Sequence, residues 1–320
     1  MAIVSDYTAI LAYLDNDTLR WNGMTAVGAP VIVTYSFVES ADLPDLADSN
    51  YNVSSCWSFS EVQREYFRQV AAQYEAVAGI ILVEVTGDAM VNIPGANVSG
   101  VGGLVNGNGN MEPGRYGYQV NLHEFGHAMA LEHPHQIDSA TLDSDFDTQA
   151  NTVMTYNIGA PYATDLSPFD KQALVHLYGS VDLVAGWQVT VAEDGSLDAV
   201  GSDRSETMIA VDRAARLDAG LGNDMIFGRE WQDTLIVGAD ADTFVFETTV
   251  GYIKVVVEYF EQGSYHLDYT AFAGTGWADV QQFDYESGAG VLVYVDTGHP
   301  SLLLTGISQG SILETDFIFA

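Results

Sequence analysis

Apolar side chains recur at strand spacing and at helix spacing in the N-terminal half of the chain. Residues 30–37 are β-branched and aromatic, as is typical of a strand, and residues 80–85 form a second such run. Ser58 and Glu61 have the spacing of a capping box, which predicts a long helix over residues 58–78. Its apolar stripe has helical spacing: Val62, Tyr66, Val70, Tyr74 and Val77. This order predicts an α/β unit.

A further helix is predicted from Pro168 to Leu177. Ser167 is a suitable N-cap, Pro168 fits the first helical position, and Gly179 follows the last turn. We therefore expect a domain boundary at about residue 180, which divides the chain into domains 1–180 and 181–320. The Gly- and Asn-rich segment Gly95 to Gly114 is expected to form loops and an edge strand.

The second half of the chain is β-rich and carries a nine-residue repeat. Residues 219–227 (AGLGNDMIF) are close to the calcium-binding nonapeptide G-G-x-G-x-D-x-U-x, in which U is apolar. One frame gives a series of apolar positions: Met208, Leu217, Ile226, Leu235 and Phe244. Such a repeat predicts a parallel β-roll whose interior holds the apolar residues, so the whole chain is expected to have an α+β fold.

The acidic positions of the same frame are candidate calcium ligands. They are Glu206, Asp224, Asp233 and Asp242. Ala215 interrupts the acidic series, and glycines are poorly kept in residues 228–231 and 237–240. One or two structural Ca²⁺ ions are therefore expected in place of a full row. The alternative is an ordinary β-domain with coincidental spacing.

Composition narrows the range of partners. The 320 residues include 44 acidic and 10 basic side chains, and the formal net charge of −34 argues against nucleic acid. The hydrophobic content of 48% is that of a globular protein. No apolar run reaches the ~18 residues of a membrane span. Cys56 is the only cysteine, so no intramolecular disulfide is possible, and in a secreted protein bound metals would serve as staples instead. We expect a monomer.

The segment HEFGHAMALEH, from His123 to His133, has the spacing of a metal site. On a helix, His123 and His127 lie at i and i+4 on one face and can bind one ion. Glu124 is displaced by one residue and can act on a metal-bound water without being a ligand. His133 can be the third ligand only if the chain turns back after the helix. Three protein ligands leave a position open, as in catalytic zinc sites.

An HExxH pattern also arises in helices by chance. The third histidine argues against chance here, and so does Met154 within Val-Met-Thr-Tyr, 21 residues after His133. Histidine is scarce in this chain, with seven residues in all, and three of them fall within this one segment. Satisfied core or surface histidines would not be expected to concentrate in this way.

The zinc motif, the Val-Met-Thr-Tyr segment and the nonapeptides together resemble the serralysins, secreted zinc endopeptidases of the metzincin clan. Trp21 with residues 33–37, residues 170–179 and residues 240–320 are similar to that family too. The resemblance covers most of the chain. It implies a metzincin-like catalytic domain followed by an all-β domain with a short parallel β-roll and a β-sandwich.

Carried over by position, the resemblance implies that His123, His127 and His133 bind one Zn²⁺ and that Glu124 is the general base. Met154 would form the floor beneath the metal. Tyr156 would bind zinc at rest and hydrogen-bond the oxyanion during catalysis.

The resemblance also implies protein or peptide substrates and secretion without a classical N-terminal signal peptide. Export would use a type I secretion apparatus that reads an uncleaved signal in residues 316–320. A proteinaceous inhibitor is a further candidate partner.

Ala130 departs from the family pattern, which has glycine where the chain leaves the helix. A left-handed alanine there would cost roughly 1–2 kcal/mol. Ala130 and the eroded repeat glycines motivate a second hypothesis, a calcium-binding surface or adhesion protein with an inactive metzincin-like domain. A third hypothesis is a purely structural metal site, which would not need Glu124.

Overall fold

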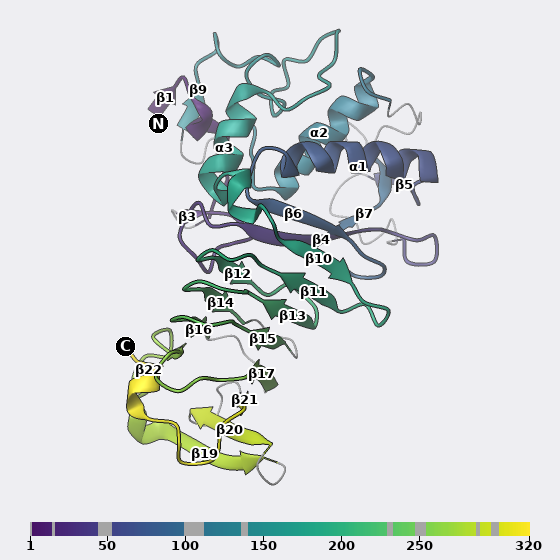
Figure 1. Cartoon of the computed structure of the whole chain (residues 1–320). Helices are drawn as coiled ribbons and strands as arrows, with labels where there is room; N and C mark the ends of the chain where they lie inside the picture. The colour runs from purple at the N-terminus through teal and green to yellow at the C-terminus, as the bar shows by residue number, and fades with distance from the viewer. Residues whose placement is uncertain are drawn as a thin grey trace. The chain divides into compact units, whose positions relative to one another are not determined.

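The computed structural model describes residues 2–14, 17–43, 53–98, 112–135, 140–228, 233–246, 254–285, 289–295 and 301–320. The chain forms two compact units, Met1–Leu183 and Val184–Ala320 (Figure 1). Strands predominate, and the described residues contain three α-helices. None of the helices in these ranges has the length and apolar character needed to cross a membrane.

A three-stranded parallel sheet lies at the centre of the first unit. Its middle strand is β4 (Val31–Phe37), flanked by β6 (Ile80–Glu84) and β7 (Val91–Ile93). Every residue of β4 is buried, because a central strand of a parallel sheet is covered on both faces. The two strands predicted over residues 30–37 and 80–85 are confirmed.

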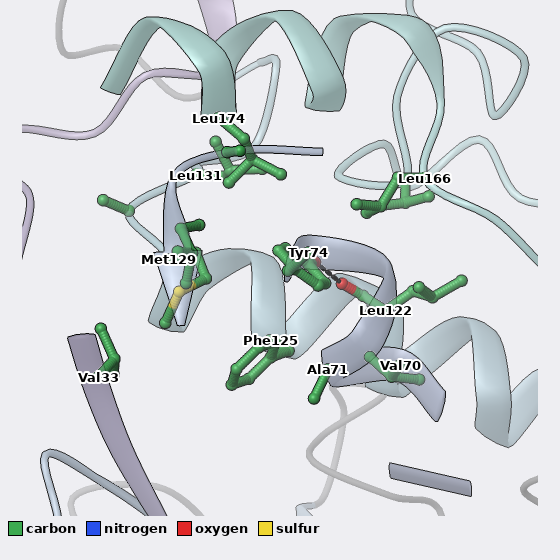
Figure 2. Close-up of a cluster of buried hydrophobic side chains, with 14 of the residues drawn as sticks. Val33, Val70, Ala71, Tyr74, Leu122, Phe125, Met129, Leu131, Leu166 and Leu174 are labelled. Carbon is green, nitrogen blue, oxygen red and sulfur yellow. Dashed lines mark hydrogen bonds between the residues drawn. The ribbon is translucent and has the colours of Figure 1, made fainter. Parts of the chain in front are cut away.

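Helices α1 (Glu61–Glu75) and α2 (Tyr116–Ala128) lie on the same face of this sheet (Figure 1). Phe125 of α2 meets Phe67 and Tyr74 of α1 edge-on, with ring centroids 5.2 and 5.0 Å apart. Figure 2 shows the Tyr74 hydroxyl donating to the Leu122 carbonyl oxygen at 2.6 Å. This buried hydrogen bond and the aromatic contacts hold α2 in place.

The predicted start of α1 is wrong by two residues. The N-cap is Ser60, whose side chain accepts the Gln63 backbone N–H, while the Gln63 side chain accepts the Ser60 N–H. The chain enters the helix late because Phe59 is still buried in the core. Val62 is consequently 65% exposed and lies outside the apolar stripe.

Helix α3 (Pro168–Tyr178) closes the first unit as predicted. Ser167 is its N-cap, and Gly179 follows it with φ 73°. The remaining short strands of this unit are β1 (Ala2–Val4), β2 (Tyr13–Leu14), β3 (Asp17–Thr18), β5 (Val53–Trp57), β8 (Gly95–Val98) and β9 (Ala140–Leu142). Within the segment from Gly95 to Gly114, where loops and an edge strand were expected, Gly95–Val98 form β8 and pair with β5 in a two-stranded sheet, and residues 99–111 lie outside the described part.

The second unit is built from two sheets whose parallel strands alternate along the chain. One sheet contains β11 (Leu197–Val200), β13 (Ala215–Asp218), β15 (Thr234–Ile236) and β17 (Lys254–Glu258). The other contains β12 (Thr207–Ile209), β14 (Met225–Phe227), β16 (Thr243–Val245), β18 (His266–Asp268) and β22 (Phe317–Ile318). Successive nonapeptides therefore pass from one sheet to the other, which is the arrangement of a β-roll.

The apolar series of the repeat fills the interior of this roll. Met208 pairs with Ile226 and Ile226 pairs with Phe244 in one sheet, and Leu217 pairs with Leu235 in the other. All five side chains are 0% exposed. The predicted parallel β-roll is therefore present, and its nine-residue frame is the one read from the sequence.

Antiparallel strands extend the first of these sheets to eight strands. They are β10 (Gln188–Val191) at one edge, and β19 (Val280–Tyr285) and β20 (Gly290–Val295) at the other, where β21 (Ser301–Thr305) pairs parallel with β17 and antiparallel with β20. The region in which a β-sandwich was expected thus continues the same two sheets. Residues 317–318, within the predicted export signal, form the edge strand β22 beside β18.

Candidate metal centre

Helix α2 and the turn after it bring three imidazoles together. The Nε2 atom of His133 lies 3.1 Å from Nε2 of His123 and 3.1 Å from Nε2 of His127. In the part of the chain that the structure describes, this is the only group of three or more potential ligand residues with donor atoms within 4.8 Å. The structure thus unites the three predicted ligands.

The outer nitrogens of two of these rings fix their tautomers. His123 Nδ1 lies 2.9 Å from the Val153 carbonyl oxygen, and His127 Nδ1 lies 2.7 Å from that of Leu131. Because a carbonyl oxygen can only accept, each Nδ1 carries the proton, and each Nε2 offers a lone pair. Burial also lowers the pKa of His123 to about 4, so the ring is neutral at neutral pH.

This donor set fits a zinc ion. Tetrahedral ligands at about 2.0–2.1 Å from zinc are about 3.3 Å from one another. The separations of 3.1 Å are close to this value. Neutral imidazoles held by carbonyl groups on their outer nitrogens are also the usual arrangement around protein-bound metals.

The chain turns back to His133 at Ala130, which has φ 66°. Ala130 therefore adopts the left-handed conformation that the motif requires, at the steric cost of a Cβ atom. Residues from the N-terminal segment clamp this turn. The Ala12 N–H donates to the Ala130 oxygen at 3.1 Å, and the Glu132 N–H donates to the Ile10 oxygen at 2.8 Å.

The last carbonyl groups of α2 are capped by two distant aromatic side chains. Trp21 Nε1 donates to the Ala128 oxygen at 2.7 Å, and the Tyr178 hydroxyl donates to the Met129 oxygen at 3.3 Å. Orphan carbonyls at a helix end need such partners. With the backbone contacts above, they hold a strained turn in place.

Glu124 follows His123 on α2 and lines a pocket formed with residues of other elements. Burial raises the pKa of its carboxyl group to about 7. A carboxyl group with a pKa near neutrality can both accept and donate a proton at neutral pH. The other residues around the pocket are mainly apolar: Phe59, Phe67, Val91, Asn92, Ile93, Pro94, Asn121, Phe125 and Ala128.

Met154 is fully buried against α2. A Cβ atom at Gly126 would lie 2.5 Å from the Met154 sulfur, so the methionine packs directly on the helix at this point. Gly126 lies between His123 and His127 along the helix. Met154 therefore packs on the part of α2 that carries the two ligands, and its role as a floor beneath a metal stays a prediction.

Asp170 supports the turn that carries Met154, a function that the sequence analysis did not assign. This buried carboxyl group accepts from Thr152 Oγ1 at 2.6 Å and from the Val153 N–H at 2.9 Å. It also accepts the Ser167 N–H at 2.8 Å. Because the Val153 carbonyl accepts from His123, Asp170 is connected to a ligand through one residue. Burial raises the pKa of Asp170 to about 6.

Tyr156 lies among the imidazoles, where the resemblance placed it. Its ring centroid is 5.9 Å from that of His123 and 4.4 Å from that of His133. The side chain is 53% exposed. Burial, followed by the charges of Glu124 and Glu132, raises the pKa of its hydroxyl group, so the phenol is protonated at neutral pH.

His135 is a neighbour of the cluster that sequence reasoning missed. Its ring centroid is 4.9 Å from Tyr156 and 5.4 Å from His133. The available signal was a fourth histidine two residues after the motif.

The acidic residues of the repeat do not all come together. Asp224 Oδ1 accepts the Glu206 N–H at 2.8 Å, and Asp242 Oδ1 accepts the Asp224 N–H at 2.8 Å. Each partner is 18 residues away, so these three belong to one edge of the roll. Asp233 instead accepts the Ala215 N–H and precedes a strand of the other sheet. The nine-residue frame thus separates Asp233 from Asp224 and Asp242.

The second oxygens of Asp224 and Asp242 are buried without a hydrogen-bond partner. Burial is the largest cause that raises the pKa of Asp224 to about 7 and that of Asp242 to about 6. Buried carboxylate oxygens without donors are costly unless a cation or proton neutralises them. This edge therefore fits Ca²⁺, which prefers oxygen ligands.

Sequence comparison gives a distant relationship. No protein-family profile matches the chain. The chain is 24% identical to serralysin of Proteus mirabilis over 234 residues, which cover 55% of this chain and 45% of that protein. The chain thus spans less than half the length of this relative. The match indicates a distant relationship to that metalloprotease.

Among solved structures, the AlgE6R3 subunit of the Azotobacter vinelandii mannuronan C5-epimerase covers 38% of this chain and 77% of its own. The sequence identity is 20% and the TM-score is 0.33, a value too low to establish a shared fold.

Proposed function

We propose that this chain is a zinc-dependent endopeptidase that hydrolyses peptide bonds in proteins or peptides. The observation that carries the proposal is the convergence of three Nε2 atoms, two of them from α2, the helix that also carries Glu124, whose carboxyl group has its pKa raised to about 7. A structural zinc site has no use for such a carboxyl group. The distant relationship to serralysin supports the same activity.

In this proposal His123, His127 and His133 hold the ion, which would supply Lewis acidity at the scissile carbonyl and lower the pKa of a coordinated water. Glu124 accepts a proton from the attacking water and returns it to the amine as the C–N bond breaks. The Tyr156 phenol donates a hydrogen bond to the oxygen on which negative charge develops. Met154 and Asp170 hold the ligands in place.

The second unit is proposed to bind one or two structural Ca²⁺ ions at Asp224 and Asp242, with Glu206 on the same edge. We further propose a secreted monomer that leaves the cell through a type I apparatus, as the serralysin resemblance implies. The hydrolysis assay below does not depend on these additional proposals.

The decisive experiment compares casein and quenched-peptide hydrolysis by the wild type and Glu124→Gln, with zinc content measured in parallel. We expect the substitution to lower kcat by about 10²- to 10⁴-fold while zinc stays bound. Glu112→Gln, at an exposed site before α2, is the matched control and should retain activity. Zinc-loaded wild type without hydrolysis of any substrate would overturn the proposal.

The alternative function, a calcium-binding surface or adhesion protein with an inactive domain, gains no support from the site. Its main motivation was Ala130, yet Ala130 adopts the left-handed conformation and His133 reaches the other two ligands. In the assay above, the alternative predicts zinc binding without hydrolysis and no effect of Glu124→Gln.

A further inference from the structure

The ring of Tyr156 is packed between imidazole rings, and one of these, that of His135, is not a proposed metal ligand. Its centroid lies 4.4 Å from His133 at an interplanar angle of 52°. It lies 4.9 Å from His135, also at 52°. The rings of His133 and His135 are stacked, 5.4 Å apart at 20°. The three side chains thus form a closed set of mutual contacts.

His135 is held by the backbone around it. It follows His133 and Pro134, and the proline ring fixes one backbone angle of the intervening residue. Pro134 is buried, and its carbonyl oxygen accepts the Leu142 N–H from β9 at 2.8 Å. The segment that carries His135 is therefore anchored to the fold, although the His135 side chain is exposed.

Tyr156, by contrast, has a half-exposed side chain. Its ring contacts are with His123, His133 and His135. His123 and His133 are fixed by their place in the metal centre. The third contact, with His135, is the one that can be altered without removing a proposed ligand.

We propose that His135 is a positioning residue that holds the Tyr156 ring against His133 and so keeps its hydroxyl group beside the metal centre. This inference rests on the proposed function, because it concerns the group that would stabilise the developing oxyanion. The property of His135 that matters in this proposal is its flat aromatic ring. Replacement by phenylalanine should preserve the positioning, and replacement by alanine should abolish it.

The first test is geometric and uses metal-free protein. With ring-labelled tyrosine and histidine, NMR should show cross-peaks between the rings of Tyr156 and His133. Their absence in Tyr156→Phe and in His133→Gln assigns them to this pair. We expect the cross-peaks to persist in His135→Phe and to be lost in His135→Ala. Cross-peaks of unchanged intensity in His135→Ala would overturn the proposal.

The second test measures hydrolysis by zinc-loaded protein. The energy of one aromatic pair predicts that His135→Ala lowers kcat by about three- to tenfold and changes KM by less than about twofold. His135→Phe should stay within about twofold of the wild type. In a Tyr156→Phe background, His135→Ala should have no further effect, because the hydroxyl group that it positions is gone.

The positioning role would be overturned if His135→Ala and His135→Phe lowered kcat equally. It would also be overturned if His135→Ala lowered kcat in the Tyr156→Phe background as much as in the wild type. The two tests also separate this inference from the proposed function. If zinc-loaded wild type hydrolyses no peptide, the endopeptidase proposal fails, and the NMR measurement alone decides whether His135 holds Tyr156.

Discussion

The candidate metal centre of the first unit and the acidic edge of the second differ in how the protein holds the candidate ligand side chains. Around the histidines, the outer nitrogens of His123 and His127 already have backbone partners. On the edge of the roll, one oxygen of Asp224 and one of Asp242 remain buried without a partner. The first site is organised before an ion arrives, and the second is incomplete without one.

This difference predicts different consequences of metal binding. An organised site needs no rearrangement when its ion binds and can use the ion for chemistry. An incomplete site gains relief from buried, unpaired charge, so its ion acts mainly on folding. Zinc should therefore govern activity, and calcium should govern the stability of the second unit.

The largest expected effect on stability is that of calcium. At a concentration 100 times its Kd, an ion that binds only the folded state adds about 2.7 kcal/mol to the free energy of unfolding. Thermal unfolding with calcium and with EGTA should show a rise in Tm of the second unit. Asp242→Asn should abolish the rise, and Asp284→Asn, an exposed site on β19, should preserve it. Identical melting curves with and without calcium would break the comparison.

The pH dependence of the calcium-free protein should follow the same two carboxyl groups. The pKa values of Asp224 and Asp242 are raised to about 7 and about 6 in the folded state. The folded protein thus binds these protons more tightly than the unfolded chain does. Their contribution to stability is complete below the ordinary aspartate pKa of about 3.9 and is lost as pH rises through 6 and 7. Urea unfolding across this range should show the decline, and calcium should reduce it.

A smaller effect is expected at the support of the metal centre. One oxygen of the Asp170 carboxylate accepts the N–H groups of Val153 and Ser167, and the other accepts the Thr152 hydroxyl group; in Asp170→Asn one of these two acceptors becomes an N–H₂ donor. We expect about 10- to 100-fold weaker zinc binding. Competition with a zinc chelator would measure it. Asp165→Asn, an exposed neighbour, should bind zinc as the wild type does.

Features that depend on local spacing along the chain were predicted correctly from the sequence, and features that depend on contacts between distant segments were not. The nine-residue frame correctly identified the interior of the roll, because each apolar side chain fills the same position in every turn. The spacing of the histidines likewise predicted their convergence. The side of the roll to which Asp233 belongs was not predicted, since the frame does not show that successive turns alternate between sheets.

Contacts between distant segments were the other limit. The spacing of Ser58 and Glu61 satisfied the pattern of a capping box, but burial of Phe59 moved the helix start to Ser60. Asp170 resembled an ordinary residue of a first helical turn. Its bond to Val153 depends on how two loops meet, which local spacing does not encode.

The smallest expected effect concerns the turn itself. Ala130→Gly should relieve the left-handed strain, partly offset by the greater freedom of glycine in the unfolded chain, with a net gain of about 0.5–1 kcal/mol. Ala128→Gly, in the last turn of α2, should instead lose about 1 kcal/mol. Denaturant unfolding of the three proteins would measure both. A loss in Ala130→Gly would show that the strain is absent.

The clamp on that turn has a consequence for the order in which the molecule is made. The segment at residues 10–12 is synthesised before the three histidines, whereas Tyr178, which caps Met129, follows more than 40 residues after His133. A ribosome-bound chain that has just exposed all three histidines therefore lacks one of the hydrogen bonds that hold the turn at Ala130. The proposed zinc site has all the hydrogen bonds that hold its turn only once α3, the last helix of the first unit, has been synthesised and has docked. Catalytic competence would therefore arrive late in biosynthesis.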